Sequence, residues 1–237
     1  MTARMRRRAD IRRRVSNPKD AYERCRVFGC RQPTTAQARK GLHRLYCRRH
    51  VDHYRRHGSY FRASYSVSEL TSYRRAAHDW LDSHRDASAV DLAVSAIQRL
   101  YDSAGQHIEA FRLTGRKPDE RARAAWARLR EAGIDPLRPL AAWLALEMKL
   151  IDDPQADRSA EYKRVQGAKL VHRLASGTHK RWEQEGRNGR IIVTELHKYP
   201  ASRGVVLRHI GEAIESAAAP VVEAHLEVIH ARVEAEQ

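Results

Sequence analysis

Three cysteines and one histidine constrain this chain more than any other feature of its sequence. The segment reads Cys25-x4-Cys30-x16-Cys47-x2-His50, and the chain has no further cysteine. Three sulfurs and one imidazole form a standard tetrahedral set for structural zinc and leave no open position for a catalytic water. Gly29 permits a tight turn before Cys30. The Cys-x2-His spacing places two ligands on one face of a first helical turn.

Disulfide bonds are the alternative use of these cysteines. The count is odd, and no apolar leader segment follows the Arg-rich start, so a secreted disulfide framework is not expected. We therefore predict one Zn²⁺ ion held by Cys25, Cys30, Cys47 and His50. Three nearby histidines are alternative fourth ligands: His43, His53 and His57.

Positive charge is concentrated in the same part of the chain. The 237 residues contain 45 Lys and Arg against 29 Asp and Glu. Residues 1–65 carry a net charge of +15, whereas residues 66–237 carry only +1, and residues 1–62 hold 17 Arg but 2 Lys. The planar guanidinium matches phosphate oxygens and guanine edges and stacks on bases. This asymmetry predicts a nucleic-acid-binding arm followed by a near-neutral domain.

DNA is the predicted partner, and RNA is the alternative, because Arg-rich tails and zinc knuckles also serve RNA. We expect residues 1–20 to stay disordered until bound and to add sequence-independent affinity. The predicted nucleic-acid contacts are basic side chains with one aromatic among them: Arg6, Arg7, Arg8, Arg12, Arg13, Arg14, Arg48, Arg49, Tyr54, Arg55, Arg56 and Arg62.

The segment from Cys25 to Phe61 resembles the small Cys3His zinc motif of phage and mobile-element proteins, which often accompanies HNH-type or recombination-endonuclease-like proteins. The matching pieces are Lys40-Gly41-Leu42, Cys47-Arg48-Arg49-His50, Tyr54-Arg55-Arg56-His57-Gly58 and Tyr60-Phe61. The resemblance covers under a sixth of the chain. It implies a zinc-dependent DNA-binding protein, a regulator or accessory factor of a mobile element. The motif itself is a binding module and does not imply cleavage.

No catalytic residues are predicted. An HNH nuclease needs a general-base histidine beside a metal-binding histidine and an Asn or Asp. The trio His50, Asp52 and His53 is suggestive, but His50 is already assigned to zinc and no Asn-x-x-His partner follows. A metal-dependent HNH-like nuclease therefore stands as the alternative function, with His53 as the residue to test.

From Ser66 onward the apolar residues recur at helical spacing, and the predicted fold class is mostly α. Ser66 with Glu69, and Ser88 with Asp91, predict capping boxes. Further helices are expected from Pro118, from Asp135-Pro136, over 161–175, and over 202–236 with a break at Pro220. The run 191–194 is strand-like, and 186–190 is expected to be a turn.

These patterns predict four parts: a basic disordered tail (1–20), a zinc module (21–62), a multi-helix domain (63–185) and a C-terminal helical segment (186–237). The last segment is expected to pack on the core or to form a dimer seam. The helical domain would thus contact a second copy or a protein partner. The longest apolar run, 140–146, is far shorter than the ~20 residues that a bilayer requires. We expect a cytoplasmic, nucleoid-associated protein.

Overall fold

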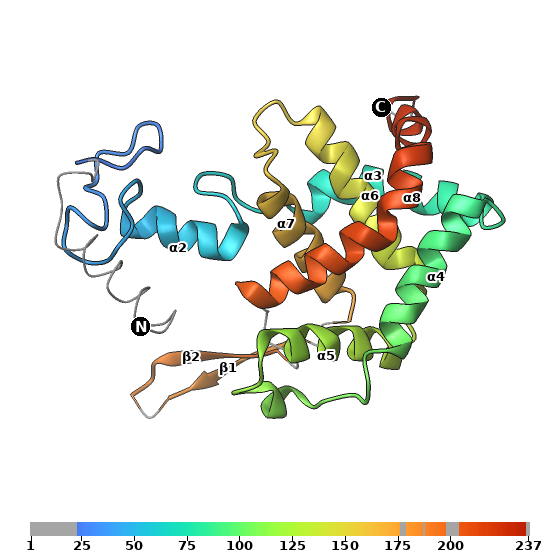
Figure 1. Ribbon diagram of the computed structural model, residues 1–237. Helices are drawn as coiled ribbons and strands as arrows, with labels where there is room; N and C mark the ends of the chain where they lie inside the picture. The colour runs from blue at the N-terminus through green and yellow to red at the C-terminus, as the bar shows by residue number, and fades with distance from the viewer. Residues whose placement is uncertain (1–22, 176–178, 187, 198–203, 236–237) are drawn as a thin grey trace, which may run out of the picture. The chain divides into compact units, whose positions relative to one another are not determined.

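The computed structural model describes residues 23–175, 179–186, 188–197 and 204–235, and these residues are mostly α-helical (Figure 1). The predicted fold class is therefore confirmed. The chain divides into two compact units, Met1–Ala63 and Ser64–Gln237. The predicted tail, residues 1–20, lies outside the described residues.

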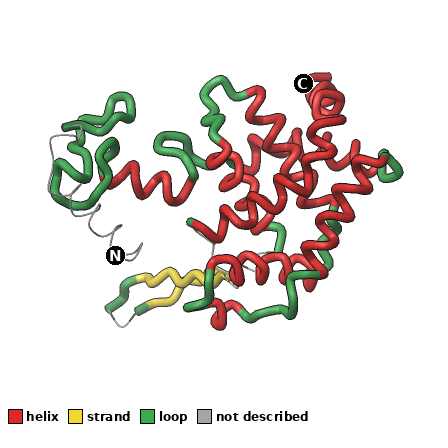
Figure 2. Tube along the Cα trace, viewed as in Figure 1, coloured by secondary structure: helices red, strands yellow, loops and turns green. Residues whose placement is uncertain are grey.

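The described part of the first unit is built from irregular loops and the short helix α2 (Arg48–His57) (Figure 2). The loops are tied to one another by backbone hydrogen bonds, among them Arg26 N–H to Leu45 O at 3.0 Å and Thr35 N–H to Tyr46 O at 3.0 Å. Gly58 ends α2 with φ 75°, a left-handed conformation that glycine adopts without steric cost.

The described part of the second unit contains six α-helices, one 3₁₀ helix and one β-hairpin. Its elements are α3 (Val67–Ser83), α4 (Ser88–Asp102), η2 (Ala110–Leu113), α5 (Pro118–Glu131), α6 (Leu137–Asp152), α7 (Ala160–Arg173), β1 (His179–Glu185), β2 (Ile191–His197) and α8 (Val205–Ala235).

Helix α6 lies at the centre of this unit. Leu140, Trp143, Leu144 and Met148 are all inaccessible to solvent, and buried side chains occur on every side of the helix. A helix that is apolar all round is stable only when other helices cover it. Here α3, α7 and α8 pack around α6, and α4 and α5 add further side chains to the same hydrophobic core.

Helix α8 packs against α3, α4, α5, α6 and α7. Its Ile210, Ile214, Ile229 and Val233 are buried in the core. The C-terminal segment therefore packs on the helical core as part of the same compact unit. The predicted break at Pro220 is wrong, because α8 runs continuously through that residue.

Ion pairs and hydrogen bonds join the core helices at their half-buried edges. Lys163 Nζ of α7 lies 2.9 Å from Glu147 Oε1 of α6 and 3.3 Å from Glu215 Oε1 of α8. The Tyr73 hydroxyl donates to Asp152 Oδ2 at 2.6 Å, and His230 Nε2 lies 2.8 Å from Asp152 Oδ1. These contacts fix the register of α3, α6, α7 and α8.

The strand-like run 191–194 belongs to strand β2 of an antiparallel hairpin in which Glu185 pairs with Ile191 and Trp182 pairs with Thr194. Hydrogen bonds from Gly186 N–H to Arg190 O and from Gly189 N–H to Gly186 O close the loop, so the predicted turn is confirmed. No described helix has both the length and the apolar content needed to cross a membrane.

Candidate metal centre and basic helix face

Cys25, Cys30, Cys47 and His50 come together in the first unit, and their ligand atoms all lie within 4.8 Å of one another. His50 Nδ1 lies 3.2 Å from Cys25 Sγ and 3.4 Å from Cys47 Sγ, and the Cys30 and Cys47 sulfurs are 4.0 Å apart. A tetrahedral zinc site with bonds of 2.0–2.3 Å has ligand–ligand edges of about 3.5–3.8 Å. The four side chains could therefore hold one metal ion.

A tight turn brings the first two cysteines together. Cys30 N–H donates to Val27 O at 3.0 Å, which closes a four-residue turn. Gly29, the third residue of this turn, has φ 74°, so the role that the sequence predicts for this glycine is confirmed. Cys25 N–H donates to Gln32 O at 2.9 Å, which folds the chain back beside the turn.

The start of α2 supplies the other two ligands. Cys47 is the N-cap residue of α2, and His50 lies three residues later in its first turn. Side chains at this spacing share one face of the helix, as the sequence predicts. The structure adds that His50 faces the sulfurs through Nδ1, which the sequence does not reveal.

The surroundings favour the ligating form of the imidazole. Burial lowers the pKa of His50, and the charges of Arg49 and His53 lower it further, which favours the neutral ring. Burial raises the pKa of the Cys25 thiol, but hydrogen bonds from the Cys47 and Val27 amides oppose this and bring the net pKa below its usual value. Burial raises the pKa of the Cys47 thiol.

An aromatic stack lies in the same unit as the candidate metal centre. The Tyr60 ring is stacked between Tyr46, at a centroid distance of 3.6 Å, and Tyr54, at 4.4 Å. His43 Nε2 lies 3.2 Å from the Tyr60 hydroxyl. In a segment with so few aliphatic residues, these rings supply much of the packing that a short metal-dependent module requires.

The three alternative histidine ligands have other positions. His43 contacts Tyr60, while His53 Nδ1 lies 2.8 Å from the Ser59 carbonyl oxygen, and the His53 and His57 rings stack at 4.4 Å. None of them belongs to the four-residue cluster described above, which contains His50.

The arginines of α2 lie on the side of the helix away from His50. With 3.6 residues per turn, Arg48, Arg49, Arg55 and Arg56 fall within about a third of the helix circumference, opposite His50. All four are exposed. Their spacing makes α2 a two-sided element, with His50 of the candidate metal centre and Tyr54 of the aromatic stack on one side and guanidinium groups on the other. We call the four arginines the basic face of α2.

Asp52 lies in the middle of the basic face. Arg48 Nε donates to Asp52 Oδ2 at 2.8 Å, and Arg55 Nη1 lies 3.2 Å from Oδ1. The hydrogen bond from Arg48 and the charges of the neighbouring arginines lower the pKa of Asp52. The carboxylate thus aligns two guanidinium groups and is already engaged by them.

The other predicted nucleic-acid contacts have varied positions. Tyr54 is half-buried in the aromatic stack, and Arg62 is half-buried. Further exposed residues that the sequence did not single out lie near the turn of the candidate metal centre: Phe28, at its tip, is fully exposed, and Arg26 and Arg31 flank it in the sequence. Arg26 and Phe28 lie between Cys25 and Cys30, and Arg31 follows Cys30, so their closeness to the predicted ligands in the sequence could have indicated them. The predicted contacts in the tail lie outside the described residues: Arg6, Arg7, Arg8, Arg12, Arg13 and Arg14.

Within the described residues, one group of three or more His, Cys, Asp or Glu side chains is arranged to hold a metal ion, and it is the Cys3His cluster. Of the trio considered for a nuclease site, His50 lies in that cluster and Asp52 is paired with Arg48 and Arg55. Comparison of the chain with protein-family models, with curated proteins and with solved structures finds no match.

Proposed function

We propose that the first unit is a zinc-stabilised nucleic-acid-binding module and that duplex DNA is its partner. The observation that carries this proposal is the two-sided construction of α2. One side provides His50 to the candidate metal centre, and the other presents the basic face. A metal ion bound at His50 would hold the basic face in a fixed orientation.

Zinc is the metal that this donor set suits best. Three thiolates and one imidazole are soft or borderline ligands, and three of their separations, 3.2, 3.4 and 4.0 Å, are close to the edges of a tetrahedral site. All four positions are filled by protein, so the ion would stabilise the fold and would not activate water.

The charge of the module supports a phosphate polymer as partner. Residues 23–63 contain ten arginines and one lysine against two acidic residues. Neutralising DNA phosphates with these side chains would release condensed counterions, which is the main source of sequence-independent affinity. A role as regulator or accessory factor of a mobile element is the further proposal, and it rests on the sequence resemblance.

The test is duplex binding by the full zinc-loaded chain, measured by fluorescence anisotropy across a salt series. The double variant Arg49→Ala and Arg56→Ala should weaken binding by about tenfold or more. It should also reduce the slope of log K against log salt by about 0.9 for each lost phosphate contact. The matched control is Arg99→Ala, an exposed arginine on α4.

An unchanged affinity and salt slope in the double variant would refute the role of the basic face. Competition with a folded RNA separates the two polymers, and preference for RNA would replace DNA as the partner. Incubating the protein with supercoiled plasmid and Mg²⁺ or Mn²⁺ tests the nuclease alternative. Nicking that is lost in His53→Ala would make the protein an enzyme.

A further inference from the structure

The second unit has a positively charged groove that the proposed function does not use. A hollow of about 260 Å³ lies between α3, the start of α6 and the end of α7, and a second hollow of about 350 Å³ adjoins it. Both are lined by Arg74 and Arg138, so they form one groove, which we call the basic groove.

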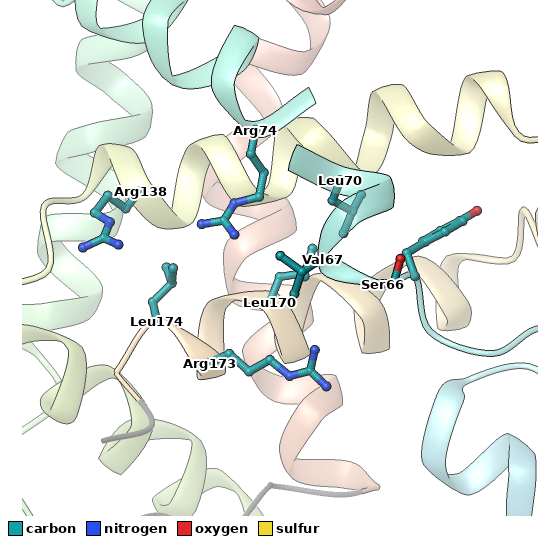
Figure 3. A pocket seen from close by; sticks show the side chains of 9 residues that line it. Ser66, Val67, Leu70, Arg74, Arg138, Leu170, Arg173 and Leu174 are labelled. Carbon is teal, nitrogen blue, oxygen red and sulfur yellow. The ribbon is translucent and has the colours of Figure 1, made fainter. Parts of the chain in front are cut away.

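The basic groove combines guanidinium groups with an apolar floor. Figure 3 shows the side chain of Leu174 pointing up between the guanidinium groups of Arg74 and Arg138. Leu70 and Leu170 continue this surface, and we call the three leucines the leucine floor. Arg173 lines the same hollow at its other side (Figure 3).

The positive charge of the groove is not balanced locally. Among the described residues that line the two hollows, none is acidic. Two carboxylates of α3 lie next to lining residues in the sequence. Glu69 accepts hydrogen bonds from the Ser66 amide at 2.7 Å and from its hydroxyl at 2.6 Å, as part of the helix cap, and Asp79 Oδ1 lies 3.9 Å from His78 Nδ1. Arg74 and Arg138 form no hydrogen bond or ion pair with a carboxylate in the part of the chain that the structure describes. A guanidinium group binds phosphate and carboxylate oxygens through paired N–H donors, so two of them lining one hollow form a candidate anion site.

The surroundings favour a small ligand over a polymer. Residues 66–237 have a net charge of only +1, against +15 for residues 1–65, so the charge that attracts a phosphate polymer is concentrated in the first unit. A concave site with an apolar floor and a few convergent polar groups is typical of small-molecule binding.

We propose that the basic groove binds a small organic phosphomonoester, with its phosphate held by Arg74 and Arg138 and its apolar body on the leucine floor. This site is independent of the metal centre and of the proposed nucleic-acid interface. The protein would then have two binding functions, one for a phosphate polymer in the first unit and one for a small phosphate ester in the second.

Calorimetric titration of the full zinc-loaded chain with adenosine monophosphate, adenosine and inorganic phosphate tests the proposal. The monophosphate should bind at least tenfold more tightly than adenosine, because adenosine lacks the anion, and more tightly than inorganic phosphate, which lacks the apolar body. Arg74→Gln and Arg138→Gln should each weaken monophosphate binding by at least tenfold. The control Arg99→Ala should bind it as the wild type does.

Two results would overturn the proposal. One is equal binding of the monophosphate and adenosine, and the other is unchanged monophosphate affinity in both glutamine variants with wild-type helical circular dichroism. Measuring duplex DNA binding by the same variants tests whether the two functions are separate. It should stay at the wild-type level, and a loss of DNA binding without any monophosphate binding would assign the groove to the polymer instead.

Discussion

At the scale of single residues, side chains of one type have very different roles in this protein. His50 faces three sulfurs at the candidate metal centre, whereas His172 is 5% exposed within the helical unit. Asp52 aligns two arginines at the surface, whereas Asp153 accepts a buried hydrogen bond from the Tyr65 hydroxyl at 2.8 Å. Position in the fold, not residue type, decides what each group contributes.

His172 makes the stability of the helical unit depend on pH. Burial, together with the charges of Arg128, Arg173 and Arg121, lowers the pKa of His172 to about 3. Below pH 6.5 the unfolded chain therefore binds a proton that the folded chain does not, and the free energy of unfolding falls as the pH falls. This one group should remove about 2 kcal/mol between pH 7 and pH 5.

His172→Gln should flatten that dependence. Urea unfolding followed by circular dichroism at several pH values between 7 and 5 measures it. The variant starts less stable at pH 7, and its deficit relative to the wild type should shrink by about 2 kcal/mol at pH 5. Parallel curves for the two proteins would show that His172 does not control the pH dependence.

Asp52→Asn tests the arrangement of the basic face. Removing the carboxylate releases Arg48 and Arg55 from their ion pairs and raises the net charge of the first unit by one. Under the proposed function, duplex affinity should rise severalfold at low salt and the salt dependence should steepen. Anisotropy measures both quantities, and weaker binding would mean that Asp52 must hold the arginines in place for DNA contact.

At the scale of elements, close approach between α7 and α8 depends on a glycine. A Cβ atom on Gly211 would lie 2.4 Å from the Arg164 carbonyl oxygen. Alanine normally stabilises a helix by about 1 kcal/mol relative to glycine, so a loss of stability here would come from the contact alone. Because the obstacle is backbone, the two helices must move apart.

Gly211→Ala should destabilise the helical unit by about 1–3 kcal/mol. Thermal or urea unfolding measures this, and Glu223→Ala, an exposed change in the same helix, serves as the control. A stability equal to or above that of the wild type would mean that α7 and α8 pack less closely than the structure shows.

Element boundaries show what the sequence alone could predict. The Ser66 capping box is confirmed, because Glu69 N–H donates to Ser66 Oγ at 3.3 Å. The box expected at Ser88 is wrong, because Ala87 is the N-cap residue and Ser88 is already helical. Pro220 does not break α8, since Ala218 and Val221 on either side are buried in the core and their packing offsets the missing hydrogen bond.

The candidate site was predictable where chemistry depends on spacing. The four ligands and the turn at Gly29 follow from the spacing of the cysteines and of one glycine. The Tyr46–Tyr60–Tyr54 stack and the use of His50 Nδ1 depend on loop contacts between residues far apart in the sequence, which spacing cannot encode. The basic groove likewise requires α3, α6 and α7 to be placed together.

At the scale of the whole molecule, the two compact units have different sources of stability. The helical unit has an extensive apolar core, whereas the first unit contains a candidate metal centre and a few stacked rings. If zinc holds the first unit, Cys30→Ser should unfold it and leave most of the helical circular dichroism signal intact, because serine is a poor zinc ligand.

Metal analysis should find about one zinc per wild-type chain and much less in Cys30→Ser. Circular dichroism of the variant and of chelator-treated wild type should agree, and unfolding of the helical unit should occur at the wild-type temperature. A collapse of the whole helical signal in the variant would contradict the division into two units.

The packing of α8 also sets an order for assembly during synthesis. This last helix contributes Ile210, Ile214, Ile229 and Val233 to a core shared with five earlier helices. Until residues beyond 230 have left the ribosome, those helices lack the apolar surface of α8 that covers part of their core. The four metal ligands, in contrast, all emerge within the first 50 residues. If the proposed zinc ion binds, the nascent chain can take it up and complete the first unit before the core of the helical unit is complete.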